Sequence, residues 1–174
     1  MGFFSSFSFQ KEKGKIKKET LENIHQHEEN RVLLKENIKL NLESVDKYQA
    51  IKMAGKILVD SGYVEEDYIE AMIQREKDLS TYIGCGVAIP HGVGKARKLI
   101  KKSGIVVLQF PKGVDFGVEK AYLVIGIAGV GDKHLQILSN IATIIGEDQE
   151  KLEHLKTTKD VQYIYETFTR IQSS

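Results

Sequence analysis

The sequence of 174 residues is poor in the residues that mark secreted or membrane-spanning proteins. It holds one cysteine, two prolines and no tryptophan. A single cysteine, Cys85, cannot form a disulfide within the chain, which agrees with a reducing compartment. No run approaches the roughly 20 apolar residues of a membrane-spanning helix, and the N-terminus lacks the ordered regions of a secretory signal. We therefore expect a cytoplasmic protein without direct membrane insertion.

An excess of charge of one sign is also missing. The 25 Lys and Arg residues nearly balance the 24 Asp and Glu residues, so the formal net charge is +1. Nucleic-acid-binding domains typically carry a positive excess, and the charge therefore indicates no nucleic-acid partner. Hydrophobic residues make up 41% of the chain, which is typical of a soluble globular protein of about one domain.

The first 35 residues differ in composition from the rest. An aromatic and serine-rich opening, MGFFSSFSF, precedes a charged stretch with few apolar positions. We expect residues 1–35 to form an N-terminal extension, partly disordered or helical, and residues 36–172 to form the folded domain. The best helical candidate near the extension is a polar stretch with four weak apolar anchors: Glu19–Glu36, with Leu21, Ile24, Val32 and Leu33.

The hydrophobic pattern after residue 36 changes between strand and helix. Apolar residues at helical spacing predict helices over Val45–Asp60, with Ser44 as the N-cap, and over Glu65–Lys77. Short runs rich in Val and Ile predict strands that are covered on both faces. The fold class is therefore α/β, with a single mixed β-sheet flanked by helices on both faces. The other expected elements are strands at Ile38–Leu40, Val87–Ile89, Ile105–Phe110 and Tyr122–Ala128, a turn at Pro111–Gly117, and helices at Lys95–Lys102, His134–Ile145, Gln149–Lys156 and Lys159–Ile171.

Two histidines follow two of these strands. His91 comes directly after one strand, where Pro90 fixes the exit and Gly92 gives the backbone freedom for a tight turn. His134 follows another strand after a glycine-bearing loop and begins a helix. In open α/β sheets, ligands bind beyond the carboxyl ends of strands, where helix N-termini also attract anions. The two histidines therefore indicate a shared phosphoryl site.

Phosphoryl transfer suits a histidine in this place. Neutral imidazole presents a lone pair at cellular pH without a separate base. A second imidazole or a guanidinium can bind the oxygens of the transferring group, and His134 and Arg75 are the candidates. Each residue also has an ordinary structural explanation. A histidine near a strand end is more often a hydrogen-bonded structural residue, and Arg75 near a helix C-terminus interacts favourably with the helix dipole.

Four stretches resemble one known family. They are Arg75-Glu76-Lys77, Thr81 through Gly92, Phe110 through Gly117, and Leu123 through Gly129 running on to His134-Leu135. From about Glu36 to Ile171, the chain is similar to the enzyme IIA component of the bacterial phosphoenolpyruvate-dependent sugar phosphotransferase system, in its mannitol branch. The resemblance implies a phosphotransferase component of sugar transport, without a cofactor or a metal.

The resemblance also implies partners and roles. In the family, the histidine that matches His91 accepts a phosphoryl group from the phosphocarrier HPr. It then passes the group to a cysteine of the IIB domain, which phosphorylates the incoming sugar at the membrane. The residues that match His134 and Arg75 support the phosphoryl group. Mannitol-type relatives carry an acidic residue where this chain has Cys85, so the contribution of that acid is missing here.

Other functions fit parts of the pattern less well. A regulatory module, whose phosphorylation at His91 controls a protein partner, would use the same loop. A zinc hydrolase with His91, His134 and Cys85 as ligands lacks a recognisable general base. The basic cluster around Lys95–Lys102 is most simply a solvated helix face, although it also raises the local potential for anions near His91.

Overall fold

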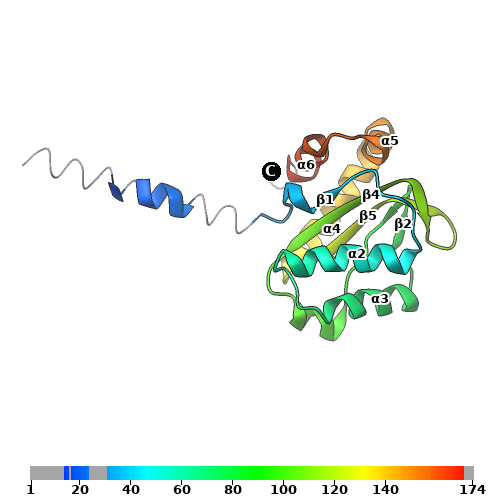
Figure 1. The fold of residues 1–174 in the computed structure, drawn as a ribbon, viewed down its shortest axis with the longest axis horizontal. Coiled ribbons are helices and arrows are strands. Elements are labelled where there is room, and N and C mark those ends of the chain that lie inside the picture. The colour runs from blue at the N-terminus through cyan, green and yellow to red at the C-terminus, as the bar shows by residue number, and fades with distance from the viewer. Residues whose placement is uncertain (1–13, 16, 24–30, 171–174) are drawn as a thin grey trace, which may run out of the picture. The chain divides into compact units, whose positions relative to one another are not determined.

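The structure, a computed structural model, describes residues 14–15, 17–23 and 31–170. The chain divides into two compact units, Met1–Arg31 and Val32–Ser174. In the first unit, residues 14–15 and 17–23 are helical and exposed. The second unit holds all the described strands, and its helices and sheet are shown in Figure 1.

One mixed sheet of five strands organises the second unit. Its order is β1-β4-β5-β3-β2. β1 is parallel to β4 and β3 is parallel to β5, whereas β4 with β5 and β2 with β3 are antiparallel pairs. A parallel and an antiparallel pairing on the same central strand make the sheet mixed, as predicted. The strands are β1 (Ile38–Lys39), β2 (Tyr82–Gly84), β3 (Val87–Ala88), β4 (Gly104–Asp115) and β5 (Lys120–Ala128).

Helices cover both faces of this sheet. α2 and α3 pack on one face, and α4, α5 and α6 pack on the other, as Figure 1 shows. Among the described residues, no helix is long and apolar enough to cross a bilayer. The helices are α2 (Lys47–Asp60), α3 (Tyr68–Asp78), α4 (Asp132–Glu147), α5 (Gln149–Thr157) and α6 (Val161–Arg170), with 3-10 turns η1 (Lys35–Asn37) and η2 (Gly94–Leu99).

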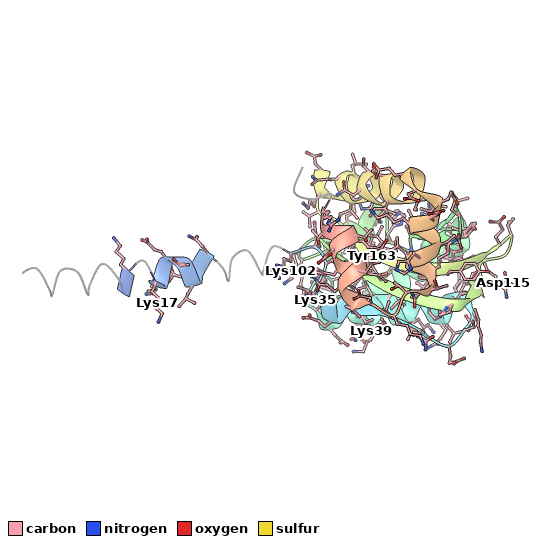
Figure 2. The ribbon with its side chains drawn as sticks, turned by 90° about the horizontal axis from the view of Figure 1, so that it is seen from above. Lys17, Lys35, Lys39, Lys102, Asp115 and Tyr163 are labelled. Atoms are coloured by element: carbon pink, nitrogen blue, oxygen red, sulfur yellow. The ribbon has the colours of Figure 1, made fainter. Side chains whose placement is uncertain are left out.

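Alternation along β4 supplies both halves of the core. Ile105 and Val107 pack in the cluster beneath α4, α5 and α6, whereas Val106 and Leu108 pack in the cluster beneath α2 and α3. All four are buried, because successive side chains of a strand point to opposite faces. Most of the charged side chains in the described residues lie on the outside, and Figure 2 labels the exposed Lys35, Lys39 and Lys102. The apolar runs thus reflect strands covered on both sides.

The start of the folded unit differs from the expected polar helix. Val32 and Leu33 are buried in the hydrophobic core instead of lying on a helix that extends to Glu36. Residues 31–34 are not helical, and η1 follows them. Ile24 lies outside the described residues. The prediction of one helix over Glu19–Glu36 is therefore wrong over residues 31–34, because the side chains of Val32 and Leu33 pack into the core.

Helix α2 begins later than predicted. The Asp46 carboxylate accepts hydrogen bonds from the backbone N–H groups of Tyr48 and Gln49, at 3.0 and 3.1 Å, so Asp46 is the N-cap. Ser44, the predicted N-cap, instead donates its hydroxyl to the Gly113 carbonyl at 2.7 Å. Ser44 thus ties the chain to the far end of β4.

Three further boundaries differ from the prediction. The expected turn at Pro111–Gly117 largely continues β4 through Asp115, after an irregularity in its pairing with β5 between Gln109 and Val114. The basic stretch after His91 forms the short 3-10 turn η2 instead of an α-helix. β2 has no counterpart in the prediction, because Tyr82–Gly84 lacks an apolar run and pairs only at a sheet edge.

Candidate active site

Parallel pairing of β3 and β5 brings the two predicted histidines together. Both strands end at the same edge of the sheet, and the loops after them carry His91 and His134. The two imidazole rings lie 5.4 Å apart between centroids, at an angle of 52°. Residues 43 positions apart in the sequence therefore share one site, as the spacing beyond the strand ends predicted.

The hydrogen bond of His91 sets its tautomer. Its Nδ1 lies 2.6 Å from the carbonyl oxygen of Ile89. Because a carbonyl oxygen only accepts, Nδ1 carries the proton and donates it in this bond. In the neutral ring, the lone pair then resides on Nε2. His91 is 8% exposed, so its nucleophilic nitrogen lies in a largely dry position.

Burial favours the neutral form of both imidazoles. Desolvation lowers the pKa of His91 below 6.5, and the charges of Arg75 and Arg97 lower it further, against the opposing effect of the Ile89 carbonyl. Desolvation also lowers the pKa of His134, with smaller contributions from His91 and Arg97. Both rings are therefore neutral at pH 7, which is the form that attacks phosphorus.

A cavity of about 280 Å³ lies beside His134. Arg97 from η2 and the Gly129–Gly131 loop after β5 line it together with the beginning of α4, where Asp132 and Leu135 also contribute. A guanidinium, an imidazole and a helix N-terminus are groups that bind a phosphoryl oxygen. The acidic Asp132 in the same wall adds an opposing charge.

Arg97 is the functional candidate that the sequence reasoning did not single out. Arg97 belongs to the basic stretch Lys95–Lys102, which the sequence predicts to be a solvated helix face that also raises the local potential for anions. In the structure, the charge of Arg97 acts on the pKa of both histidines. The sequence does show that Arg97 follows His91 by only six residues. It does not show the geometry of η2, which brings Arg97 and not Lys98 to the cavity.

Arg75 lies near the C-terminal end of α3, as predicted. Its guanidinium donates to the carbonyl oxygen of Leu79, four residues along the chain. The side chain is half-buried, and its charge contributes to the lowered pKa of His91. Arg75 is thus close enough to act on the site electrostatically while its donor satisfies a carbonyl at the helix end.

Glycine at position 92 has a different physical reason from the predicted one. The backbone of Gly92 does not have a positive φ. A Cβ at this position would lie 2.7 Å from Cε2 of Tyr68 and 3.0 Å from Cβ of Ala96. The requirement is therefore close packing, not backbone freedom. No larger residue fits directly after His91 unless Tyr68 moves.

Cys85 occupies a strained position in the hairpin that joins β2 to β3. Gly84 pairs with Val87, so Cys85 and Gly86 form a two-residue loop. Both have positive φ, 53° and 77°, as a type I′ turn requires. Gly, Asn and Asp tolerate this conformation best, so Cys85 stands where the backbone disfavours it. The thiol is exposed.

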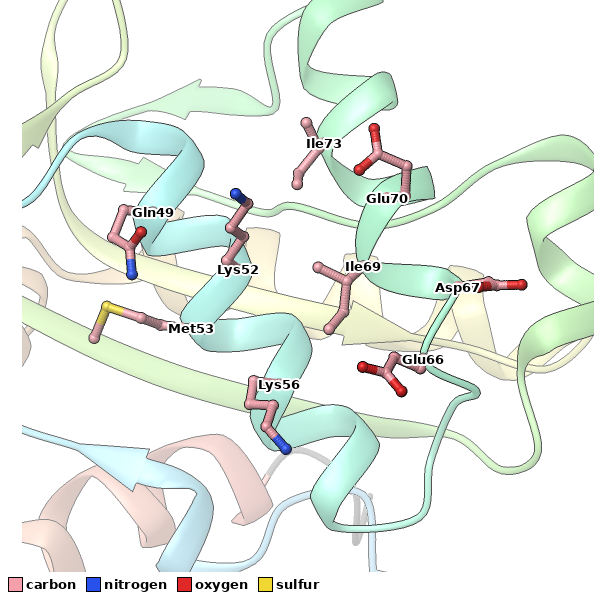
Figure 3. Close-up of a pocket in the computed structure, with 9 residues that line it drawn as sticks. All are labelled: Gln49, Lys52, Met53, Lys56, Glu66, Asp67, Ile69, Glu70 and Ile73. Atoms are coloured by element: carbon pink, nitrogen blue, oxygen red, sulfur yellow. The ribbon is translucent and has the colours of Figure 1, made fainter.

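Other parts of the described surface lack this chemistry. No group of three His, Cys, Asp or Glu side chains within the described ranges is placed to hold a metal ion. A larger cavity, of about 490 Å³, lies between α2 and α3 (Figure 3). Lys52 and Lys56 of α2 face Glu66 and Glu70 across it, but it contains no histidine. Among the described residues, the paired imidazoles are therefore the candidate reactive site.

Comparison with known proteins agrees with this geometry. The family model described as "Phosphoenolpyruvate-dependent sugar phosphotransferase system, EIIA 2" matches residues 31–171. The chain belongs to this family. It is thus a phosphotransferase component, and the predictions of family and fold class are confirmed. A mannitol-specific phosphotransferase enzyme IIA component from Bacillus subtilis is 46% identical over 141 residues, which cover 80% of this chain and 98% of that protein.

Two solved structures from Escherichia coli share the fold. The crystal structure of IIA mannitol has a TM-score of 0.72 and 40% identity, covering 78% of this chain and 98% of that one. The complex of enzyme IIA-mannitol with phosphorylated enzyme IIB-mannitol has a TM-score of 0.75 and 38% identity, covering 79% and 97%. A mannitol-specific EIICBA component from Vibrio cholerae is 41% identical over 145 residues, but the match spans 82% of this chain and only 22% of that larger protein.

Proposed function

We propose that this protein is the phosphoryl carrier of mannitol uptake, with His91 as the residue that is phosphorylated. Nε2 of His91 attacks the phosphorus of phospho-HPr as the bond to the donor breaks. A cysteine thiolate of the IIB domain then takes the phosphoryl group as the Nε2–P bond breaks. The observation that carries this proposal is the hydrogen bond from Nδ1 to Ile89, which leaves the lone pair on Nε2.

The neighbours of His91 suit both steps. When Nε2 attacks, the ring becomes cationic, and the Ile89 carbonyl stabilises the Nδ1–H that carries part of this charge. His134, 5.4 Å away between ring centroids, is placed to bind a phosphoryl oxygen. Arg75 and Arg97 supply positive charge on the same side, so the phosphoryl group passes through a site that complements its negative charge.

Exposed apolar side chains next to the site favour protein partners. Val93 follows His91 by two residues, and Leu135 directly follows His134. Leu79 accepts from Arg75 through its carbonyl. Val93 is 44% exposed, Leu135 66% and Leu79 67%, whereas most large apolar residues of the described domain are buried. HPr and IIB are the partners that the family function supplies, and both must reach Nε2 in turn.

Mannitol specificity and cytoplasmic location belong to the same proposal. The name of the 46%-identical relative from Bacillus subtilis supports mannitol, and the complex with phosphorylated IIB supports the acceptor. The family model begins at residue 31, which supports a IIA domain preceded by an extension close to the expected boundary after residue 35.

Phosphorylation in vitro tests the acceptor. Incubation with phosphoenolpyruvate, enzyme I and HPr adds one phosphoryl mass to the wild-type protein, and the His91→Ala variant gains none. The matched control is His154→Ala, because His154 is exposed on α5 and packs against Tyr163, 4.6 Å between ring centroids, away from the site. Equal labelling of His91→Ala and wild type would overturn the assignment.

Transfer to separate IIB domains tests the sugar. Phosphorylated protein should lose its phosphoryl group to the mannitol IIB domain and much more slowly to the fructose IIB domain. A protein that is labelled at His91 but donates to neither IIB domain would support the regulatory module instead. Complementation of growth on mannitol, in a strain that lacks only its IIA component, gives the same answer in cells.

A further inference from the structure

The Tyr68 hydroxyl lies between the two strand ends that carry the site. Tyr68 begins α3, yet its side chain is 1% exposed and reaches the sheet. Its hydroxyl donates to the carbonyl oxygen of Ile127 in β5, at 2.8 Å, and accepts from the N–H of Gly92, at 2.9 Å. One hydroxyl therefore connects β5 to the residue directly after His91.

This hydroxyl occupies the place of a ladder hydrogen bond. His91 and Ile127 form an isolated parallel bridge, and the N–H of Ile127 donates to the Pro90 carbonyl at 3.0 Å. In a regular parallel ladder, the N–H of residue 92 would donate to the Ile127 carbonyl. Here both of those groups bind the Tyr68 hydroxyl. The side chain is thus inserted between β3 and β5 where the strands end.

Packing and protonation keep the hydroxyl in this role. The Tyr68 ring lies against Gly92, where a Cβ would be only 2.7 Å from Cε2. Burial raises the pKa of Tyr68 to about 12, while the Gly92 N–H opposes this shift. The group consequently remains a protonated donor and acceptor throughout the physiological pH range.

We propose that Tyr68 is a positioning residue for phosphoryl transfer, whose inserted hydroxyl fixes the direction in which His91 leaves the sheet. The inference rests on His91 being the acceptor, as proposed above. Three hydrogen bonds fix the position of the imidazole. The Ile127 N–H donates to the Pro90 carbonyl, the Gly92 N–H donates to the Tyr68 hydroxyl, and Nδ1 of His91 donates to the Ile89 carbonyl. Tyr68 supplies the one of these contacts that comes from outside the sheet.

The Tyr68→Phe variant removes the hydroxyl and keeps the ring. The Gly92 N–H and Ile127 carbonyl then approach each other or remain unpaired, and His91 turns with them. We expect the rate constant for transfer from phospho-HPr to fall roughly 10- to 100-fold, because a displacement of about 1 Å has effects of this size. The KM for phospho-HPr should stay unchanged, since the exposed surface is untouched.

A matched control separates positioning from lost stability. Tyr63→Phe removes the hydroxyl of another buried tyrosine, whose ring packs against Gly104. It should transfer at the wild-type rate when both variants are measured well below their melting temperatures. In Tyr68→Phe, nitrogen-15 NMR should also show changed His91 ring resonances. A merely structural role would leave those resonances and the rate constant of the folded fraction unchanged.

Each outcome decides the proposal. A wild-type rate constant and unaltered His91 resonances in Tyr68→Phe would overturn it, as would a change in KM alone. If Tyr68→Phe does not fold, Gly92→Ala displaces the same contact from the opposite side and should slow transfer likewise. Failure of the proposed function is distinguishable, because it appears as wild-type protein that gains no phosphoryl group at His91.

Discussion

Replacing Glu76 with glutamine removes a buried charge that ties α3 to the strand leading into the site. The Glu76 side chain is fully buried. It accepts hydrogen bonds from the Ser80 hydroxyl at 2.8 Å, from the Thr81 N–H at 2.7 Å and from the Thr81 hydroxyl at 2.6 Å. Lys47 lies 3.5 Å from the same carboxylate. Thr81 in turn accepts from the N–H of Ile89, two residues before His91.

The cost of this replacement follows from these contacts. Glutamine keeps one acceptor oxygen, so the two bonds from Thr81 survive without the charge. The bond from Ser80 must reverse, and Lys47 loses its partner. Hydrogen bonds to charged groups contribute about 1.5–3 kcal/mol each, and removing one partner of a buried pair costs about 3–5 kcal/mol. Because Lys47 is partly exposed, we expect Glu76→Gln to lower the free energy of unfolding by about 2–3 kcal/mol.

Urea unfolding measures this loss. With a typical slope of about 1–3 kcal/mol per molar urea, the midpoint should fall by about 1 M. Asp60→Asn is the matched control, because the Asp60 side chain is 56% exposed in its pair with Lys56 and its replacement should leave the midpoint unchanged. Equal midpoints for Glu76→Gln and Asp60→Asn would show that the buried Glu76 charge does not stabilise the fold.

Three further predictions concern the site loop and its charges. The lowered pKa of His91 keeps the ring neutral, so the transfer rate should decline only below pH 6.5, and a rate–pH profile with its midpoint above 6.5 would contradict this. Because the unfolded chain binds a proton at His91 at a higher pH than the folded chain does, the free energy of unfolding should fall as the pH drops below 6.5. Cys85→Asn should raise the free energy of unfolding by about 0.5–1 kcal/mol and Cys85→Val should lower it by about 1 kcal/mol, because φ at this position is 53°; equal melting curves would argue against strain there. Arg97→Gln should slow transfer roughly 10-fold, less than the roughly 100-fold effect of a buried donor, whereas Lys98→Gln should match wild type in the same assay.

Much of the fold could be predicted from local pattern. The Val- and Ile-rich runs at β4 and β5 and the helical stripe of α2 follow from burial on one or both faces. The local sequence pattern gave wrong predictions at residues whose conformation is set by tertiary contacts. Val32 and Leu33 have polar neighbours in the sequence, and only the core into which they pack separates them from the extension. Ser44 suits an N-cap, but its hydroxyl is used by Gly113.

Some residues of the candidate site could likewise be predicted from the sequence, and others could not. His91 and His134 were predictable, because each follows a strand and parallel strands end at one edge of a sheet. Tyr68 and Arg97 were not, since neither follows a strand or stands in a distinctive motif. Their roles depend on where an α3 side chain meets the sheet and on how η2 turns, and both are set by packing across the chain.

The proposed phosphoryl transfer puts the phosphoryl group on Nε2 of His91. Nitrogen-15 and phosphorus-31 NMR of protein phosphorylated through HPr locates the group on one ring nitrogen of one histidine. We expect coupling of phosphorus to Nε2 of His91, with Nδ1 still carrying the proton that it donates to Ile89. Coupling to Nδ1 of His91, or to either nitrogen of His134, would contradict it.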